Sequence, residues 1–165
     1  MIISQEVLKR QHNGLLKTPA HLVGVLMPDF KELMDTAPIN LEDYVADVKI
    51  HMLMPNMWPC IPNWHYDLVP RDSENKQDFS NIDTTQKMLL YVSGPPVTEF
   101  RDSRKITPGE WHEFTQIDEH RGVKSDAFQW RVFIRLAPKT IYQAAPESAW
   151  VRFHSQVYLE PDFSW

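Results

Sequence analysis

The sequence has one cysteine, Cys60, in 165 residues, so it cannot form an intrachain disulfide. Its basic residues are scattered, with no run longer than Lys9-Arg10, and the formal net charge is −5. Extended nucleic-acid binding requires a basic stripe and is therefore not expected. No apolar run is long enough to span a bilayer, and the opening MIISQEVLKRQHN does not read as a signal peptide. We therefore expect a cytoplasmic protein with no membrane segment.

A composition of 42% hydrophobic and 24% charged residues is typical of a globular protein, and this length fits a single domain, residues 1–165. Five glycines against thirteen prolines predict rigid loops. Helical periodicity predicts short amphipathic helices at 5–17 and 28–34, so we expect residues 1–45 to form a helical cover. From residue 46 onward the apolar period becomes two, which predicts strands.

The expected strands cover 46–54, 62–71, 87–92, 98–100, 110–117, 128–136 and 150–159. Polar residues dominate 72–86, and a loop of this length inside a compact domain is often a lid. Short helices followed by many strands with proline and glycine turns predict a mainly β fold. Its core, residues 46–165, is expected to be a sandwich or jelly roll.

The stretch PNWHYDLVPR, residues 62–71, carries His65 and Asp67 two positions apart. Side chains two apart on a strand point to the same face, so both can reach one metal ion. About one such pair is expected by chance in a chain with this many histidines and acids. A hydrogen-bonded pair at a strand end remains the alternative.

A third candidate ligand, His120, ends a strand-like stretch after the Pro108-Gly109 turn, and Arg131 follows eleven residues later in the next strand. Neighbouring antiparallel strands can bring such residues to one cavity. Strand alternation predicts that Arg131 and Phe133 face inward and that Val132, Ile134 and Leu136 face outward. The rivals are His112 and His154 for the distal histidine, and Arg121 and Arg135 for the arginine.

The order His-x-Asp, a strand, Pro-Gly-x-x-x-x-Phe, His-Arg-Gly and then Arg resembles the iron(II)/2-oxoglutarate-dependent dioxygenases, over about residues 46–138. The resemblance implies a double-stranded β-helix, a kind of jelly roll. It also implies Fe(II) ligands at His65, Asp67 and His120, with Arg131 on the distal carboxylate of 2-oxoglutarate. Two imidazoles and one carboxylate on one face of octahedral Fe(II) leave three positions open. The guanidinium of an arginine suits a carboxylate because it forms two parallel charge-assisted hydrogen bonds.

Further residues are candidates for cosubstrate and substrate contact. Tyr91 and Lys87 are candidate cosubstrate-binding residues, and Asn63 and Trp58 are candidate substrate-binding residues. The expected substrate is a small molecule, a protein side chain or a nucleotide. Two alternatives stay open: a jelly-roll binding protein without catalysis, and a cupin-like metalloenzyme that does not use 2-oxoglutarate.

Overall fold

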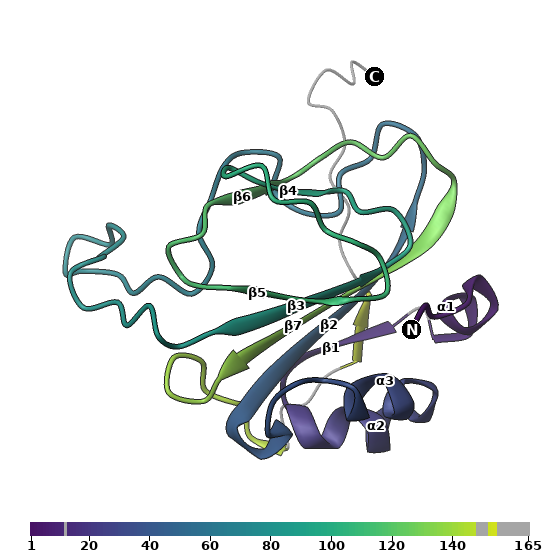
Figure 1. The fold of residues 1–165 in the computed structure, drawn as a ribbon, viewed down its shortest axis with the longest axis horizontal. Coiled ribbons are helices and arrows are strands. Elements are labelled where there is room, and N and C mark those ends of the chain that lie inside the picture. The colour runs from purple at the N-terminus through teal and green to yellow at the C-terminus, as the bar shows by residue number, and fades with distance from the viewer. Residues whose placement is uncertain (12, 148–151, 155–165) are drawn as a thin grey trace.

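The computed structural model describes residues 1–11, 13–147 and 152–154. They form a mainly β protein with one six-stranded antiparallel sheet, ordered β5-β3-β7-β2-β1-β8, and a two-stranded sheet, β4-β6 (Figure 1). The helices are α1 (Gln5–Gln11), η1 (Ala20–Leu22), α2 (Val23–Leu26), η2 (Pro28–Phe30), α3 (Lys31–Asp35) and η3 (Leu41–Asp43). The strands are β1 (Asn13–Pro19), β2 (Tyr44–Leu53), β3 (Met88–Ser93), β4 (Thr98–Phe100), β5 (Trp111–Phe114), β6 (His120–Gly122), β7 (Gln129–Pro138) and β8 (Arg152–His154).

The large sheet is covered on both faces. Helices α1, α2 and α3 lie against one face, and the β4-β6 pair lies across from the other (Figure 1). The central strand β3 divides its side chains between the two layers: Leu89 and Tyr91 join the cluster under the helices, whereas Leu90 and Val92 join the cluster on the opposite side. All six residues of β3 are buried, as expected of a strand covered on both faces.

Strands β2 and β7 pair over ten residues and form the base of the site. Val48 on β2 and Ile134 on β7 are fully buried in the helix-side core, which contributes roughly 1.5–3 kcal/mol for each side chain. The residues between these core positions face the other layer, because side chains alternate along a strand. On β7, Arg131 and Phe133 face the cavity on the side away from the helices, as predicted from strand alternation.

Successive segments alternate between the two layers. Strands β2, β3, β5 and β7 belong to the large sheet, whereas β4 and β6 belong to the small one. The segment between β2 and β3 crosses to the small sheet, where His65 forms an antiparallel bridge with His120. The amide of Gly122 also donates to the carbonyl of Ile61, at 2.9 Å. The segment that follows β2 therefore lies beside β6, on the side of the interior opposite β2 itself.

The predicted helix at 28–34 is confirmed by η2 and α3, whereas the prediction of a helix over 5–17 is wrong from Asn13 onward. From Asn13 the chain is strand β1, which pairs with β2 through Leu15 and Val48. Tertiary pairing along β2 overrides the helical periodicity there, so the first 45 residues contribute a strand as well as helices. The segment 62–71 has two isolated bridges, at His65 and Arg71, in place of the predicted strand.

The loop at 72–86 contains no helix or strand beyond the bridge of Gln77 to Arg71. Aspartate side chains close its turns; Asp72, for example, accepts the amides of Glu74 and Lys76, each at 2.9 Å. None of its residues lines the cavity described below, so its role as a lid stays a prediction. Of the strand predicted at 150–159, residues 152–154 form β8, and the rest lies outside the described residues. No helix in the described ranges has the length and hydropathy needed to cross a membrane.

Candidate metal centre

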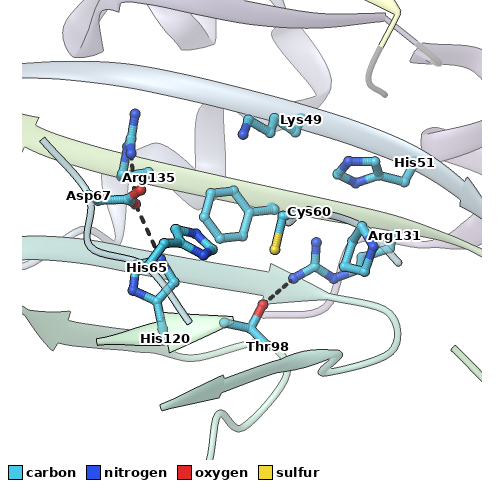
Figure 2. Close-up of a pocket in the computed structure, with 11 residues that line it drawn as sticks. Lys49, His51, Cys60, His65, Asp67, Thr98, His120, Arg131 and Arg135 are labelled. Carbon is cyan, nitrogen blue, oxygen red and sulfur yellow. Dashed lines mark hydrogen bonds and ion pairs between the residues drawn. The ribbon is translucent and has the colours of Figure 1, made fainter. Parts of the chain in front are cut away.

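Three sequence-predicted ligands converge where the small sheet meets the 61–67 segment. His65 and His120 are cross-strand partners, joined by reciprocal backbone hydrogen bonds of 2.9 and 3.0 Å. Asp67 follows two residues after His65. One ligand atom from each of the three side chains lies within 4.8 Å of the others, so together they could hold a metal ion. Figure 2 shows the three side chains grouped at one end of a cavity.

Backbone carbonyls orient both imidazoles. The Nδ1 of His65 lies 2.8 Å from the carbonyl oxygen of Asn63, and the Nδ1 of His120 lies 3.0 Å from that of Asp118. A carbonyl only accepts hydrogen bonds, so Nδ1 of each neutral ring carries the proton. The lone pair is then on Nε2. This is the arrangement in which a histidine is oriented to bind a metal.

Asp67 supplies the negative charge of the centre. Its Oδ2 lies 2.7 Å from Nη1 of Arg135 and 3.5 Å from Nε2 of His120. Burial by itself raises the pKa of Asp67, but the charge of Arg135 and its hydrogen bond to Asp67 hold that pKa well below its ordinary value. Asp67 is therefore an ionised carboxylate, as a metal ligand must be.

Arg131 occupies the opposite end of the cavity (Figure 2). Its side chain is 1% exposed, its Nε donates to the carbonyl of Pro95 at 3.0 Å, and its Nη2 donates to the hydroxyl of Thr98 at 2.9 Å. Among the described residues it has no carboxylate partner, and burial lowers its pKa to about 10. A buried guanidinium whose hydrogen-bond acceptors are neutral has the charge and donors that could bind an anion.

The wall between the two ends comes from β2 and β7. Lys49 pairs in register with Phe133, and the Nζ of Lys49 lies 5.8 Å from the centroid of that ring. His51 pairs with Arg131 and is also buried. Cys60 lines the cavity from the loop that follows β2, and burial raises the pKa of its thiol. The cavity thus runs from the His/Asp centre past an aromatic ring to a cationic end.

Four sequence-predicted contact residues lie outside this cavity. Tyr91 points into the helix-side core and donates its hydroxyl to the carbonyl of Met1 at 2.5 Å. Lys87 is exposed and donates to the carbonyl of Thr84. Asn63 is exposed and orients His65 through its backbone, and Trp58 is half-buried one residue before the cavity-lining Pro59. Only Asn63 contacts a candidate ligand, and it does so without its side chain.

The rival residues have other partners. The Nε2 of His112 lies 3.0 Å from the carbonyl oxygen of Thr107. Arg121 forms an ion pair with Glu99, and its guanidinium lies 4.5 Å from the centroid of the Trp64 ring. The side chain of His154 lies outside the described part of the chain. Arg135 lines the same cavity as Arg131, but it already pairs with two carboxylates.

The cavity contains polar residues that the sequence motif did not single out: Lys49, His51, Thr98 and Arg135. Lys49 and His51 alternate with buried apolar residues on β2. Polar residues at every second position of an otherwise apolar strand indicate a polar interior, and this was the signal available in the sequence. Thr98 had no such signal, because its contact with Arg131 depends on the packing of β4 over β7.

Comparisons of this chain with protein-family models, curated proteins and solved structures found no match. The candidate site therefore stands on its own geometry.

Proposed function

We propose that this protein is an Fe(II)/2-oxoglutarate-dependent oxygenase that hydroxylates or otherwise oxidises a small molecule, a protein side chain or a nucleotide. The observation that carries the proposal is a pair of sites in one cavity. A His/Asp/His group fit for a divalent metal lies at one end, and a buried arginine with no carboxylate partner in the described ranges lies at the other. A keto acid with a second carboxylate has the groups that both ends require.

The order of the strands supports a double-stranded β-helix as the fold. Segments alternate between a large sheet, β5-β3-β7-β2, and a smaller opposing layer of β4, β6 and the segment bridged at His65. Two layers visited in turn by one antiparallel chain are the general plan of a jelly roll. In this plan, His65 and His120 belong to one layer, where they are bridge partners, and Arg131 belongs to the other.

The donor set suits ferrous iron, because two imidazoles and one carboxylate leave three positions for the keto acid and dioxygen. Iron bound with 2-oxoglutarate supplies oxidative decarboxylation of the keto acid to succinate, coupled to oxidation of a second substrate. Arg131 and Thr98 would hold the far carboxylate, and Lys49 would add a second positive charge along the cavity. The ring of Phe133 would form an apolar part of the wall between the ends.

The direct test is anaerobic addition of Fe(II) and 2-oxoglutarate, with a search for the weak visible charge-transfer band of the chelate. We expect the band in the wild type and its loss in Asp67→Ala, together with the loss of iron-dependent succinate formation when dioxygen is then admitted. Persistence of either signal in Asp67→Ala would refute the assignment of the ligands. His112→Ala is the matched control, since His112 lies outside the cavity.

Arg131 separates the proposal from the two alternatives. A cupin-like metalloenzyme without a keto acid should retain its metal-dependent activity in Arg131→Met, whereas a 2-oxoglutarate oxygenase should lose it. A binding protein without catalysis should gain no thermal stability from Fe(II), Mn(II) or 2-oxoglutarate. A ferrous centre and a single cysteine both suit a reducing interior, so we place the activity in the cytoplasm.

A further inference from the structure

A row of alternating charges lies behind the candidate metal ligands. Asp47 on β2 and Arg135 on β7 are directly opposite in register, and Nη2 of Arg135 pairs with Oδ2 of Asp47. On its other side, Nη1 of Arg135 lies 2.7 Å from Oδ2 of Asp67. One guanidinium thus joins Asp47 of the sheet to Asp67, the carboxylate of the candidate centre. Figure 2 shows the contact between Arg135 and Asp67.

The position of Arg135 is fixed without any contribution from Asp67. Asp47 is 1% exposed, and its Oδ1 accepts the amide of Lys17 at 2.8 Å and the hydroxyl of Tyr142 at 3.1 Å. The ring of Tyr142 also lies against the guanidinium, with 5.3 Å between Cζ of Arg135 and the ring centroid. A guanidinium that is held rigidly by other contacts can restrict the orientation of a carboxylate that it hydrogen-bonds.

A carboxylate can bind a metal through one oxygen or through both. Two oxygens from Asp67 would fill a fourth position of an octahedral ion and leave only two open, one fewer than a bidentate keto acid and dioxygen require together. Arg135 holds Oδ2 of Asp67, the oxygen that also lies 3.5 Å from Nε2 of His120. A carboxylate with one oxygen fixed by a rigid guanidinium is less free to rotate and close such a chelate. The structure therefore contains a reason for Asp67 to offer a single ligand atom.

We propose that Arg135 is a positioning residue that holds one oxygen of Asp67 and restricts this carboxylate to single-oxygen ligation, which keeps three metal positions open. This inference rests on the proposed metal site and does not require that 2-oxoglutarate be the cosubstrate. It also has an electrostatic cost, since a fixed positive charge beside the carboxylate weakens the attraction of Asp67 for a divalent cation. Arg135 thus lowers the affinity of the centre for the metal and keeps one more coordination position open.

The test uses the full chain with Mn(II) alone as the probe. The variant Asp47→Asn/Arg135→Met removes one negative and one positive charge together, so Asp47 is not left as an uncompensated charge, and the bound Mn(II) then neutralises Asp67. Water-proton relaxation gives both the dissociation constant of Mn(II) and the number of water molecules on the bound ion. We expect three waters in the wild type. The double variant should show two, with Mn(II) bound about tenfold more tightly.

Two further variants make the result specific. Arg121→Met removes an arginine next to His120 that pairs with Glu99, and it should keep three waters and the wild-type affinity. Arg135→Lys keeps a positive charge and a donor in the same position, and it should restore three waters where the double variant shows two. This rescue also provides a readout if the double variant does not fold.

Three waters in the double variant, or weaker Mn(II) binding than in the wild type, would overturn the positioning role. Failure of the proposed function gives a different pattern. A wild type that binds Mn(II) with three waters but shows no charge-transfer band with Fe(II) and 2-oxoglutarate would refute the oxygenase and leave the role of Arg135 intact. A wild type that binds no Mn(II) would overturn both.

Discussion

Arg131 and Arg135 lie four residues apart on β7 and face the same cavity, yet replacing them should affect stability very differently. Arg135 pairs with Asp47 and Asp67. In the part of the chain that the structure describes, the hydrogen-bond acceptors of Arg131 are the carbonyl of Pro95 and the hydroxyl of Thr98. The perturbation is the same in each case, Arg→Met, which keeps much of the apolar stem and removes the charge. We expect Arg135 to stabilise the fold and Arg131 to bind a ligand.

The magnitude for Arg131 follows from opposing contributions. The drop in the pKa of Arg131 from 12.5 to about 10 corresponds to about 3 kcal/mol by which burial disfavours the charged form. Hydrogen bonds that involve a charged group contribute about 1.5–3 kcal/mol each, so the bonds to Pro95 and Thr98 offset most of that cost. We therefore expect Arg131→Met to change the free energy of unfolding of the metal-free protein by less than about 2 kcal/mol.

Arg135→Met leaves Asp47 and Asp67 together in the interior without their shared cation. Removing one partner of a buried ion pair typically costs about 3–5 kcal/mol. In a protein of this size each 1 kcal/mol lowers the melting temperature by roughly 2–4 °C, so the expected loss is about 6–20 °C. The measurement is thermal and urea unfolding of the metal-free variants, side by side.

The ligand response should reverse this order of importance. At a concentration of 2-oxoglutarate one hundred times its dissociation constant, with Mn(II) present, the wild type should gain about 2.7 kcal/mol of stability. Arg131→Met should lose this gain. Equal destabilisation by both substitutions would refute the reasoning, because it would mean that Arg131 has an internal partner of its own. A full ligand response in Arg131→Met would refute the anion site.

Further substitutions test other parts of the site. His65→Ala should weaken Mn(II) binding by more than about 100-fold in a titration, whereas His112→Ala should leave it unchanged; equal affinities would remove His65 from the ligand set. Gly122→Ala places a Cβ 2.7 Å from the carbonyl oxygen of Cys60, so it should cost about 1–3 kcal/mol in urea unfolding and weaken the metal site beside it. Unchanged stability would show that the strands separate easily there. Lys49→Met should weaken the binding of 2-oxoglutarate about tenfold in a competition assay, with Mn(II) affinity retained; wild-type affinity for the keto acid would exclude Lys49 from its binding site.

Much of the fold could be read from periodicity and turn chemistry. The alternating stretch from Ala46, the apolar run KMLLYV and the strand around Arg131 each became a strand close to the predicted bounds. The prediction that the helix continues to Lys17 was wrong because residues 13–19 pair with β2 as an antiparallel strand. Local sequence favoured a helix there, and a pairing partner distant in sequence favoured a strand.

The candidate centre was partly predictable as well. His65, Asp67 and His120 were identified by their spacing and by a family resemblance, and the structure brings them together. Tyr91 was assigned to the cosubstrate from its strand, but a shift of one position along a strand reverses the face, and its ring lies under the helices. That choice could not be made before the register of β3 was known.

The sequence by itself determined a mainly β chain, the residue types that a metal would require, and which side of β7 carries Arg131, because these depend on composition and on alternation within a strand. Only the tertiary structure decided that Arg131 lacks a carboxylate partner in the described part of the chain while Arg135 has two. Both are arginines on the same face of one strand. What distinguishes them is which residues β2 and the 61–67 segment place opposite each, and pairing between distant segments is a property of the folded chain alone.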